Sequence, residues 1–294
     1  MTRRGWLLFG AMCFLWGIPY LLIKVAVDDL APSVIVLART GIGAAVLLPI
    51  AAARGYLKPL LPLWKWLLFF TALEIAGPWL LLTDAERHIS SSLAGLLIAA
   101  VPLVSAITSQ LLGSDDRLDA GRLLGLGVGI AGVVVLLGLD LHGEVGAALE
   151  IGLVVLGYGT APQIITRKFA ELPSLAVIST SLALAALFYA PIAAVQWPSQ
   201  APSAKVWWSL IGLAIACTVA AFLVFFALIA EAGPNRATVI TFVNPAVALV
   251  LGVLLLDESF TAGIAVGFPL VLLGCFLATR TSRVPEPLPA VAEG

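Results

Sequence analysis

Long runs of apolar residues alternate with short polar stretches along the whole chain. A helix needs about 20 mostly apolar residues to cross the hydrocarbon core of a bilayer. Ten such windows occur, approximately at residues 5–26, 33–53, 64–83, 89–112, 121–139, 146–166, 174–196, 206–229, 237–256 and 260–279. Lipid cannot satisfy backbone N–H and C=O groups, so these windows suit internally hydrogen-bonded helices. The pattern predicts an all-α integral membrane protein with ten transmembrane helices.

The polar connections between these windows are too short to hold a soluble domain. The first window follows Thr2-Arg3-Arg4, as in a signal peptide, but it is longer than the hydrophobic region of one and lacks a convincing small-residue cleavage site. We interpret it as a retained first span. Residues 281–294 are Pro-rich and polar, which predicts a disordered tail.

Lysine and arginine residues are distributed unevenly between the two sides of the predicted helices, and this bias indicates orientation. Placing the N-terminus in the cytoplasm leaves Lys24, Arg87 and Lys205 on the opposite side. The cytoplasmic side then receives Arg3, Arg4, Arg54, Lys58, Lys65, Arg117, Arg122, Arg167, Lys168, Arg236, Arg280 and Arg283. We therefore predict a multi-pass protein with both termini in the cytoplasm.

The two halves of the chain repeat one another at a spacing of 142–143 residues. The matching positions are Trp16 with Tyr158, Pro19 with Pro162, Lys24 with Arg167, Pro49 with Pro191, Pro102 with Pro245, Gly121 with Gly263, Gly125 with Gly267 and Gly132 with Gly274. Each half holds five spans, an odd number, so the second half enters the membrane in the opposite orientation. We predict two inverted five-helix repeats, residues 1–140 and 141–280, an architecture typical of alternating-access transporters.

Composition excludes several classes of function. Hydrophobic residues make up 61% of the chain and charged residues 11%, against about 25% charged in soluble domains. The net charge of −1 gives no reason to expect nucleic acid as a partner. The three cysteines are far apart, so the sequence indicates neither a disulfide framework nor a metal site. No cofactor is indicated either. The expected partners are the lipid bilayer and a small-molecule substrate.

Prolines at matching positions of the two halves predict interrupted helices at Pro19, Pro102, Pro162 and Pro245. A proline inside a helix removes one backbone hydrogen bond, and paired interruptions mark binding sites in inverted repeats. A packing kink is the alternative at each position. Aromatic and polar side chains in these and the third predicted span form the predicted substrate-binding set: Trp16, Tyr20, Glu74, Trp79, Tyr158, Gln163 and Asn244. Ordinary interhelical packing is the alternative for the residues near the prolines, and a place in the outer aromatic belt is the alternative for Trp79.

Glu74 is the most informative charge because it lies near the middle of the third predicted span. A carboxylate at that depth is costly and therefore a candidate functional group. Either Glu74 takes up the protons that drive antiport, or it is a structural carboxyl that is neutral or paired with Arg39. Its counterpart in the second half is Ala216 or Cys217.

Glycines in the fifth span spell Gly127-x-Gly129-x-x-Gly132, a dinucleotide-binding pattern, but they lie in an apolar helix without a preceding strand, so we reject that function. Small residues at a spacing of four let helices approach closely. The glycines of the fifth and tenth spans therefore predict packing of these spans within one chain rather than a dimer interface.

The chain resembles the EamA group of the drug/metabolite transporter superfamily as far as Arg280. The resemblance rests on Trp16-Gly17, residues 39–49, the approach to Pro102, Asp115-Asp116-Arg117-Leu118, Gly132, Asn244-Pro245, Asp257-Glu258-Ser259-Phe260 and Gly274. It implies a basket-like monomer with a central cavity that exports amino acids or other metabolites across a bacterial inner membrane. Among relatives, the chain is similar to the aromatic amino-acid exporters. It departs from the small multidrug relatives, because their coupling glutamate has no counterpart in its first span.

Three classes of function compete. A membrane-embedded enzyme would need a nucleophile, metal ligands or paired acids at one depth, and Glu74 stands alone. A channel or scramblase would need a continuous polar track through many helices, and too few polar residues lie within the predicted spans to form one. We therefore predict a secondary transporter that exports small metabolites, with aromatic or bulky apolar amino acids as the first candidates. The alternative is a proton-coupled exporter of organic cations or drugs, in which Glu74 meets the positive charge.

Overall fold

The computed structural model describes residues 1–112, 119–140, 144–233, 237 and 239–279. Over these residues the chain is nearly all helical, and nine helical stretches are long and apolar enough to cross a bilayer, with Ile240–Leu255 as a shorter tenth. The prediction of an all-α membrane protein is confirmed. The predicted tail, 281–294, and the acidic turn Asp115–Leu118 lie outside the described residues.

Several spans consist of consecutive helical segments. The first half contains α1 (Arg3–Leu15), α2 (Pro19–Ala26), α3 (Pro32–Ala53), η1 (Lys58–Leu63), α4 (Trp64–Thr71), η2 (Ala72–Ala76), α5 (Gly77–Ala85), α6 (Ser91–Ile98), α7 (Val101–Leu111) and α8 (Ala120–Asp140). The second half contains α9 (Val145–Lys168), α10 (Ser174–Val195), α11 (Ala204–Ile211), η3 (Gly212–Ala220), α12 (Ala221–Ala232), α14 (Ile240–Leu255) and α15 (Ala262–Thr279).

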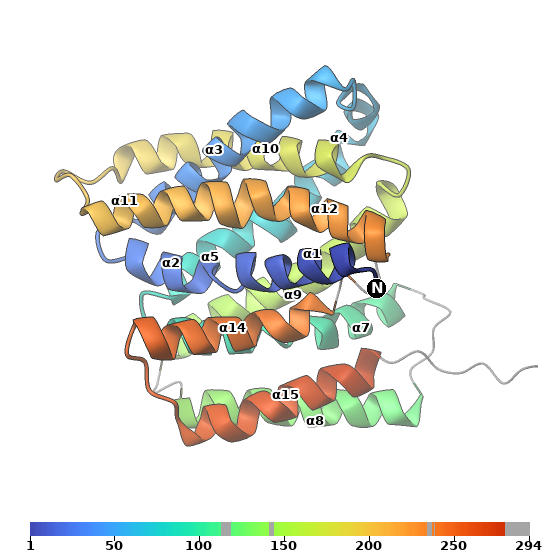
Figure 1. The fold of residues 1–294 in the computed structure, drawn as a ribbon, viewed down its shortest axis with the longest axis vertical. Coiled ribbons are helices and arrows are strands. Elements are labelled where there is room, and N and C mark those ends of the chain that lie inside the picture. Colours follow the sequence, from blue (N-terminus) through green and yellow to red (C-terminus); the bar gives the residue numbers. More distant parts are fainter. Residues whose placement is uncertain (113–118, 141–143, 234–236, 238, 280–294) are drawn as a thin grey trace, which may run out of the picture.

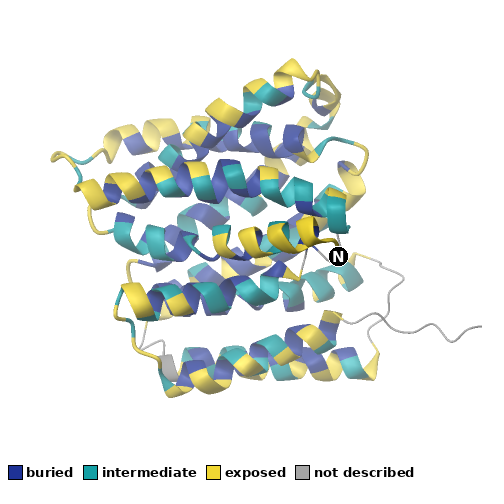
Figure 2. Ribbon diagram, in the orientation of Figure 1, coloured by how far each residue is buried: buried dark blue, intermediate teal, exposed yellow. Residues whose placement is uncertain are grey.

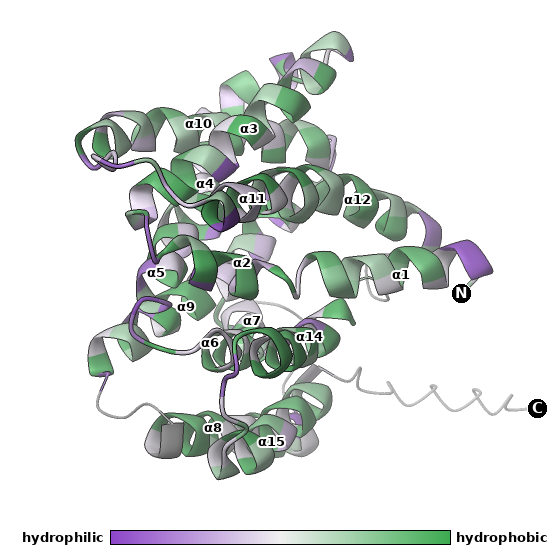
Figure 3. Cartoon of the chain, turned by 60° about the vertical axis from the view of Figure 1, so that its left-hand side comes forward, coloured by the Kyte–Doolittle hydropathy of each residue, from purple (hydrophilic) through white to green (hydrophobic). Residues whose placement is uncertain are grey.

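The helices form a bundle whose two edges are pairs of corresponding spans. At one edge α3 packs along α10, and at the other α8 packs along α15 (Figure 1). The remaining helices lie between these pairs. Buried residues gather where helices face one another, and exposed residues lie on the outer faces and at the helix ends (Figure 2). Large apolar side chains such as Leu187, Phe188 and Phe276 are among the exposed ones. Hydrophilic residues gather at helix ends and turns (Figure 3), which is the distribution expected of a protein whose sides face lipid.

Close contact between α8 and α15 depends on glycine. A β-carbon at Gly132 would lie 2.6 Å from the backbone nitrogen of Val271, and one at Gly125 would lie 2.6 Å from that of Ala278. Such distances leave no room for a larger residue without moving a backbone. The prediction that the fifth and tenth spans pack within one chain is therefore confirmed.

The interruptions at the four prolines differ between the two halves. In the first half, α1 ends at Leu15 and α2 begins at Pro19, and α6 ends at Ile98 before α7 begins at Val101. In the second half, α9 and α14 continue through Pro162 and Pro245, so the expected breaks at these two positions are wrong. A proline removes only one helical hydrogen bond, and neighbouring groups in a membrane bundle can satisfy the carbonyl that is freed.

Candidate functional site

A different pair of irregularities does occupy matching positions of the two halves. The third and eighth spans each contain a π-helical segment, η2 and η3, and Glu74 lies in η2 while its counterparts Ala216 and Cys217 lie in η3. A π segment shifts the hydrogen bonds to residues five apart and leaves nearby carbonyls in need of other donors. Gly77 and Pro78 follow η2, and Pro78 lacks an N–H. The sequence of η3 contains no proline.

Side chains from corresponding helices satisfy carbonyls of these two segments. From α3, Arg39 donates through Nη2 to the carbonyl oxygen of Cys217 at 3.5 Å and through Nε to Oγ1 of Thr218 at 2.9 Å. From α10, the Tyr189 hydroxyl donates to the carbonyl oxygen of Ala76 at 2.9 Å. Each half of the chain thus supports the irregular segment of the other.

Arg39 is the centre of the polar contacts at this depth. It is only 8% exposed, and its Cζ lies 3.6 Å from the centroid of the Trp79 ring, in a cation–π contact. Tyr158 lies near the Trp79 side chain, and Tyr20 and Tyr158 both lie within electrostatic range of Arg39. The site therefore combines one permanent positive charge with three aromatic side chains.

Arg39 has no acidic partner among the described residues. No carboxylate oxygen of the described residues lies within ion-pair distance of its guanidinium, so the alternative in which Arg39 pairs with Glu74 is not realised. A charge at the bilayer centre costs at least about 2.5–3.5 kcal/mol on insertion scales. The sequence pointed to Arg39 as a candidate partner for Glu74 and not as a member of the substrate-binding set. Its position inside a predicted span was the signal for a larger role.

Glu74 lies close to the same group of side chains. It is half-buried and within electrostatic range of Tyr158, and it forms no hydrogen bond or ion pair with any described residue. Trp16 packs against the hydrophobic cluster that contains Trp79, and its ring lies 4.7 Å from that of Phe225, centroid to centroid. The structure thus brings five of the predicted residues into one region: Trp16, Tyr20, Glu74, Trp79 and Tyr158.

Neither of the remaining two predicted residues forms a hydrogen bond with Arg39 in the described part of the chain. With its amide nitrogen facing the available acceptors, Asn244 donates to the carbonyl oxygens of Ile240 at 3.0 Å and Cys13 at 3.2 Å. It therefore joins α14 to the end of α1. Gln163 is half-buried in α9, and its side chain forms no hydrogen bond with any described residue.

A second group of charges closes one end of the bundle, which we call the Glu258 end. The Glu258 carboxylate accepts hydrogen bonds from the backbone N–H of Ser91 at 2.7 Å, the Ser91 hydroxyl at 2.9 Å and the backbone N–H of Ser92 at 2.9 Å. It thereby caps α6, because the first N–H groups of a helix lack internal partners. Lys24 donates to the carbonyl oxygens of Glu86 at 2.5 Å and Ile89 at 2.7 Å.

The Glu86 side chain also lies at this end, but its carboxyl is unsatisfied. The residue is fully buried, and neither carboxyl oxygen has a hydrogen-bond partner among the described residues. Burial raises the pKa of Glu86 well above its ordinary value, and the nearby Glu258 carboxylate raises it further, while Lys24 acts in the opposite direction. Burial without a hydrogen-bond partner therefore favours the neutral form of Glu86.

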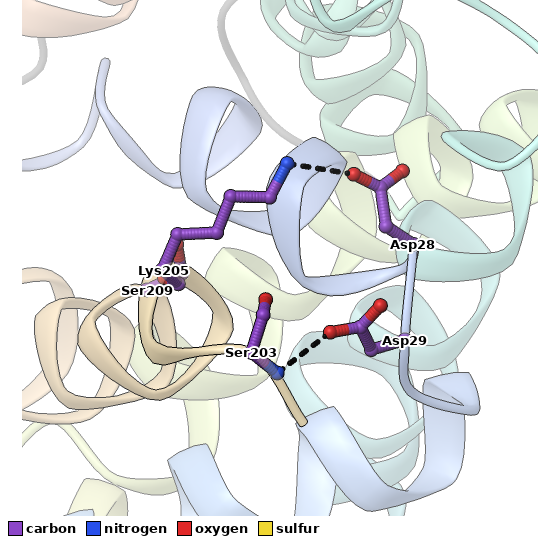
Figure 4. Close-up of polar contacts among 5 residues, drawn as sticks. All are labelled: Asp28, Asp29, Ser203, Lys205 and Ser209. Carbon is purple, nitrogen blue, oxygen red and sulfur yellow. Dashed lines mark hydrogen bonds and ion pairs between the residues drawn. The ribbon is translucent and has the colours of Figure 1, made fainter. Parts of the chain in front are cut away.

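A pocket of about 400 Å³ opens at the Glu258 end and is lined by residues that include Lys24, His88, Lys205 and Glu258. At its rim, Lys205 lies 3.3 Å from Asp28, and Asp29 accepts a hydrogen bond from the backbone N–H of Ser203 at 2.9 Å (Figure 4). This hydrogen bond lowers the pKa of Asp29. These contacts join α2 to the start of α11.

Comparison with known proteins identifies a family model and several proteins that are similar to this chain. The model of the EamA-like transporter family matches the chain twice, over residues 3–138 and 147–280. The uncharacterized inner membrane transporter YedA of Escherichia coli (strain K12) is 27% identical over 260 residues, covering 86% of this chain and 84% of the relative. An uncharacterized transporter of Archaeoglobus fulgidus is 25% identical and covers 94% of this chain and 99% of its own.

A solved structure described only as "Crystal structure of protein" has the same fold. It aligns with a TM-score of 0.67 at 22% identity and covers 95% of this chain and 97% of its own. The family model covers nearly all of both halves, and the ten apolar helices agree with it. The chain therefore belongs to the EamA-like transporter family.

Proposed function

We propose that the protein exports small metabolites, with aromatic or bulky apolar amino acids first among them, across a bacterial inner membrane by alternating access. The observation that carries the proposal is the convergence of Trp79, Tyr158 and Tyr20 around Arg39 at mid-depth. Aromatic rings offer flat apolar walls, and tyrosine and tryptophan add one hydrogen bond each. Such a lining suits an amphiphilic small molecule.

Alternating access requires two halves that can rearrange about a common site. The two separate family matches and the matching positions of η2 and η3 support the division into repeats 1–140 and 141–280. The odd number of spans in each half supports an inverted relation between them. In the orientation that we propose, both termini are cytoplasmic and the Glu258 end faces outward.

Glu74 supports a second candidate, an exporter of organic cations or drugs by proton antiport. A half-buried carboxyl without a partner among the described residues is suited to meet a substrate cation, or to exchange protons. The two candidates share one site and differ in the charge of the molecule carried.

Counterflow in reconstituted liposomes tests the proposal. We expect saturable exchange of radiolabelled phenylalanine, tryptophan or leucine above the level in empty liposomes, measured with and without a pH gradient. Trp79→Leu should reduce this exchange at least about tenfold, since it removes a wall of the site, whereas the exposed Trp197→Leu should leave it unchanged. Exchange of organic cations together with no exchange of any amino acid would favour the second candidate.

A further inference from the structure

The Arg39 guanidinium is fixed in place on three sides. Nε is held by Thr218, Nη2 faces the carbonyl oxygen of Cys217, and the plane rests against the Trp79 ring. Thr218 is itself held, because its hydroxyl donates to the carbonyl oxygen of Leu213 at 2.8 Å. A long flexible side chain is thus set in one orientation before any ligand arrives, which lowers the entropic cost of binding.

The remaining donors of Arg39 are unused. A guanidinium carries five N–H groups, and the two hydrogen bonds to η3 leave Nη1 without a partner among the described residues. The positive charge of Arg39 is likewise not neutralised by an ion pair with any described residue. Among the described residues, Glu86 is a carboxyl within electrostatic range of Arg39, but the two form no ion pair.

Support of the π segment does not account for this arrangement. Capping the carbonyl of Cys217 and bonding Thr218 would need only neutral donors, such as those of an amide. A permanent charge in the bilayer core is retained at a substantial cost, and the single backbone carbonyl that Arg39 meets, at 3.5 Å, does not balance that charge. Arginine is also the side chain whose planar fork matches a carboxylate with two parallel hydrogen bonds.

We propose that Arg39 binds the carboxylate of the transported substrate, with Nη1 donating to it and Trp79 and Tyr158 holding the apolar body. This inference rests on the proposed function and narrows it to substrates that carry a free carboxylate. Molecules that share the aromatic body but lack the carboxylate are excluded, because they leave the guanidinium unpaired.

A matched set of ligands separates the carboxylate from the rest of the substrate: L-phenylalanine, phenylpyruvate, L-phenylalanine methyl ester and phenethylamine. Binding to the purified full chain is measured by calorimetry for the wild type, Arg39→Gln and Arg39→Lys. Arg54→Gln, an exposed position at the end of the same helix, serves as the control.

The wild type is expected to bind the two carboxylates at least about tenfold more tightly than the ester and the amine. Arg39→Gln should remove this preference by weakening carboxylate binding about tenfold or more, while leaving the ester within about twofold. Arg39→Lys should fall between, because it keeps the charge but not the planar fork. Arg54→Gln should match the wild type.

Three results would overturn the proposal. The first is carboxylate binding by the wild type that survives Arg39→Gln. The second is equal binding of acid and ester by the wild type, a comparison that needs no variant and holds even if Arg39→Gln does not fold. The third is failure of the wild type to bind any carboxylate of the set. That result would also remove the proposed amino-acid substrate, whereas the first leaves it standing.

Discussion

Charged side chains are satisfied very differently at the Glu258 end and at mid-depth. At the Glu258 end, one carboxylate accepts three hydrogen bonds from Ser91 and Ser92, and Lys24 bridges two carbonyls. At mid-depth, Arg39 keeps unused donors and Glu74 forms no polar contact with a described residue. Charges at the end hold helices together, whereas those at mid-depth are left available, although the lower dielectric there makes an unpaired charge more costly.

Glu86 is the exception at the Glu258 end. It is as unsatisfied as Glu74, but it is fully buried rather than half-buried. A buried carboxyl without partners avoids the cost of its charge by remaining protonated. The contrast between the two regions therefore concerns the exposure of the charged groups as well as their pairing, and four measurements test it.

The largest effect is expected for Glu258→Ala. It leaves two backbone N–H groups and a hydroxyl at the start of α6 without their acceptor, and should lower the free energy of unfolding by about 2–4 kcal/mol. Thermal unfolding in detergent measures the change. Glu144→Ala is the matched control, because Glu144 precedes α9 without a capping hydrogen bond from its side chain. Equal losses in both variants would show that Glu258 does not close this end.

Glu86 predicts a pH dependence of stability. Its pKa is raised in the folded protein, so above its ordinary value of 4.5 the unfolded chain releases a proton that the folded protein keeps. The stabilisation that neutral Glu86 contributes is fully present at pH values below this ordinary pKa. It decreases as the pH rises, by up to about 1.4 kcal/mol per pH unit, until the pH passes the raised pKa of the folded protein.

Glu86→Gln replaces the titrating carboxyl with an amide that does not titrate. The decline in melting temperature between about pH 5 and pH 8 should therefore be smaller than in the wild type. The variant should therefore be more stable than the wild type at the alkaline end of the series. Identical pH profiles for the two proteins would contradict a neutral buried Glu86. Glu144→Gln, at an exposed position, provides the baseline.

Arg39→Met should change stability in the opposite direction to Glu258→Ala. Replacing a buried charge that has no ion-pair partner among the described residues removes its desolvation cost. This gain should outweigh the two lost hydrogen bonds to η3 and raise the free energy of unfolding of the ligand-free protein by about 1 kcal/mol. The same thermal measurement without ligand checks this, with Arg54→Met as the control. A loss as large as that of Glu258→Ala would mean that Arg39 serves the fold and not a ligand.

The smallest effect is expected for the pair at the pocket rim. Lys205 and Asp28 are 65% and 56% exposed, and such pairs contribute about 0–1 kcal/mol, less at high salt. Lys205→Gln should leave the melting temperature nearly unchanged. A large loss would indicate that the rim shown in Figure 4 also holds the bundle closed.

Part of the candidate site could be predicted from the sequence, because the free-energy cost of placing a polar or charged group in lipid applies to each residue separately. Glu74 and the aromatic residues Trp79 and Tyr158 could be selected from depth and chemistry, and the structure places them near one another. Asn244 met the same criteria, but its amide serves the junction of α14 with α1. Which polar group meets a neighbouring helix depends on the rotation of both helices, and a local pattern does not contain that angle.

The apolar pattern alone determined the ten spans, because each segment must satisfy its own backbone in lipid whatever its neighbours do. The spacing of glycines in the sequence also determined that α8 packs against α15, since glycines four residues apart form a helix face that another helix can approach closely. Tertiary packing decided the rest. Pro19 and Pro162 occupy matching positions, yet only the first lies at a break. Arg39 became the centre of the site because η3 and Trp79, distant in sequence, meet around it.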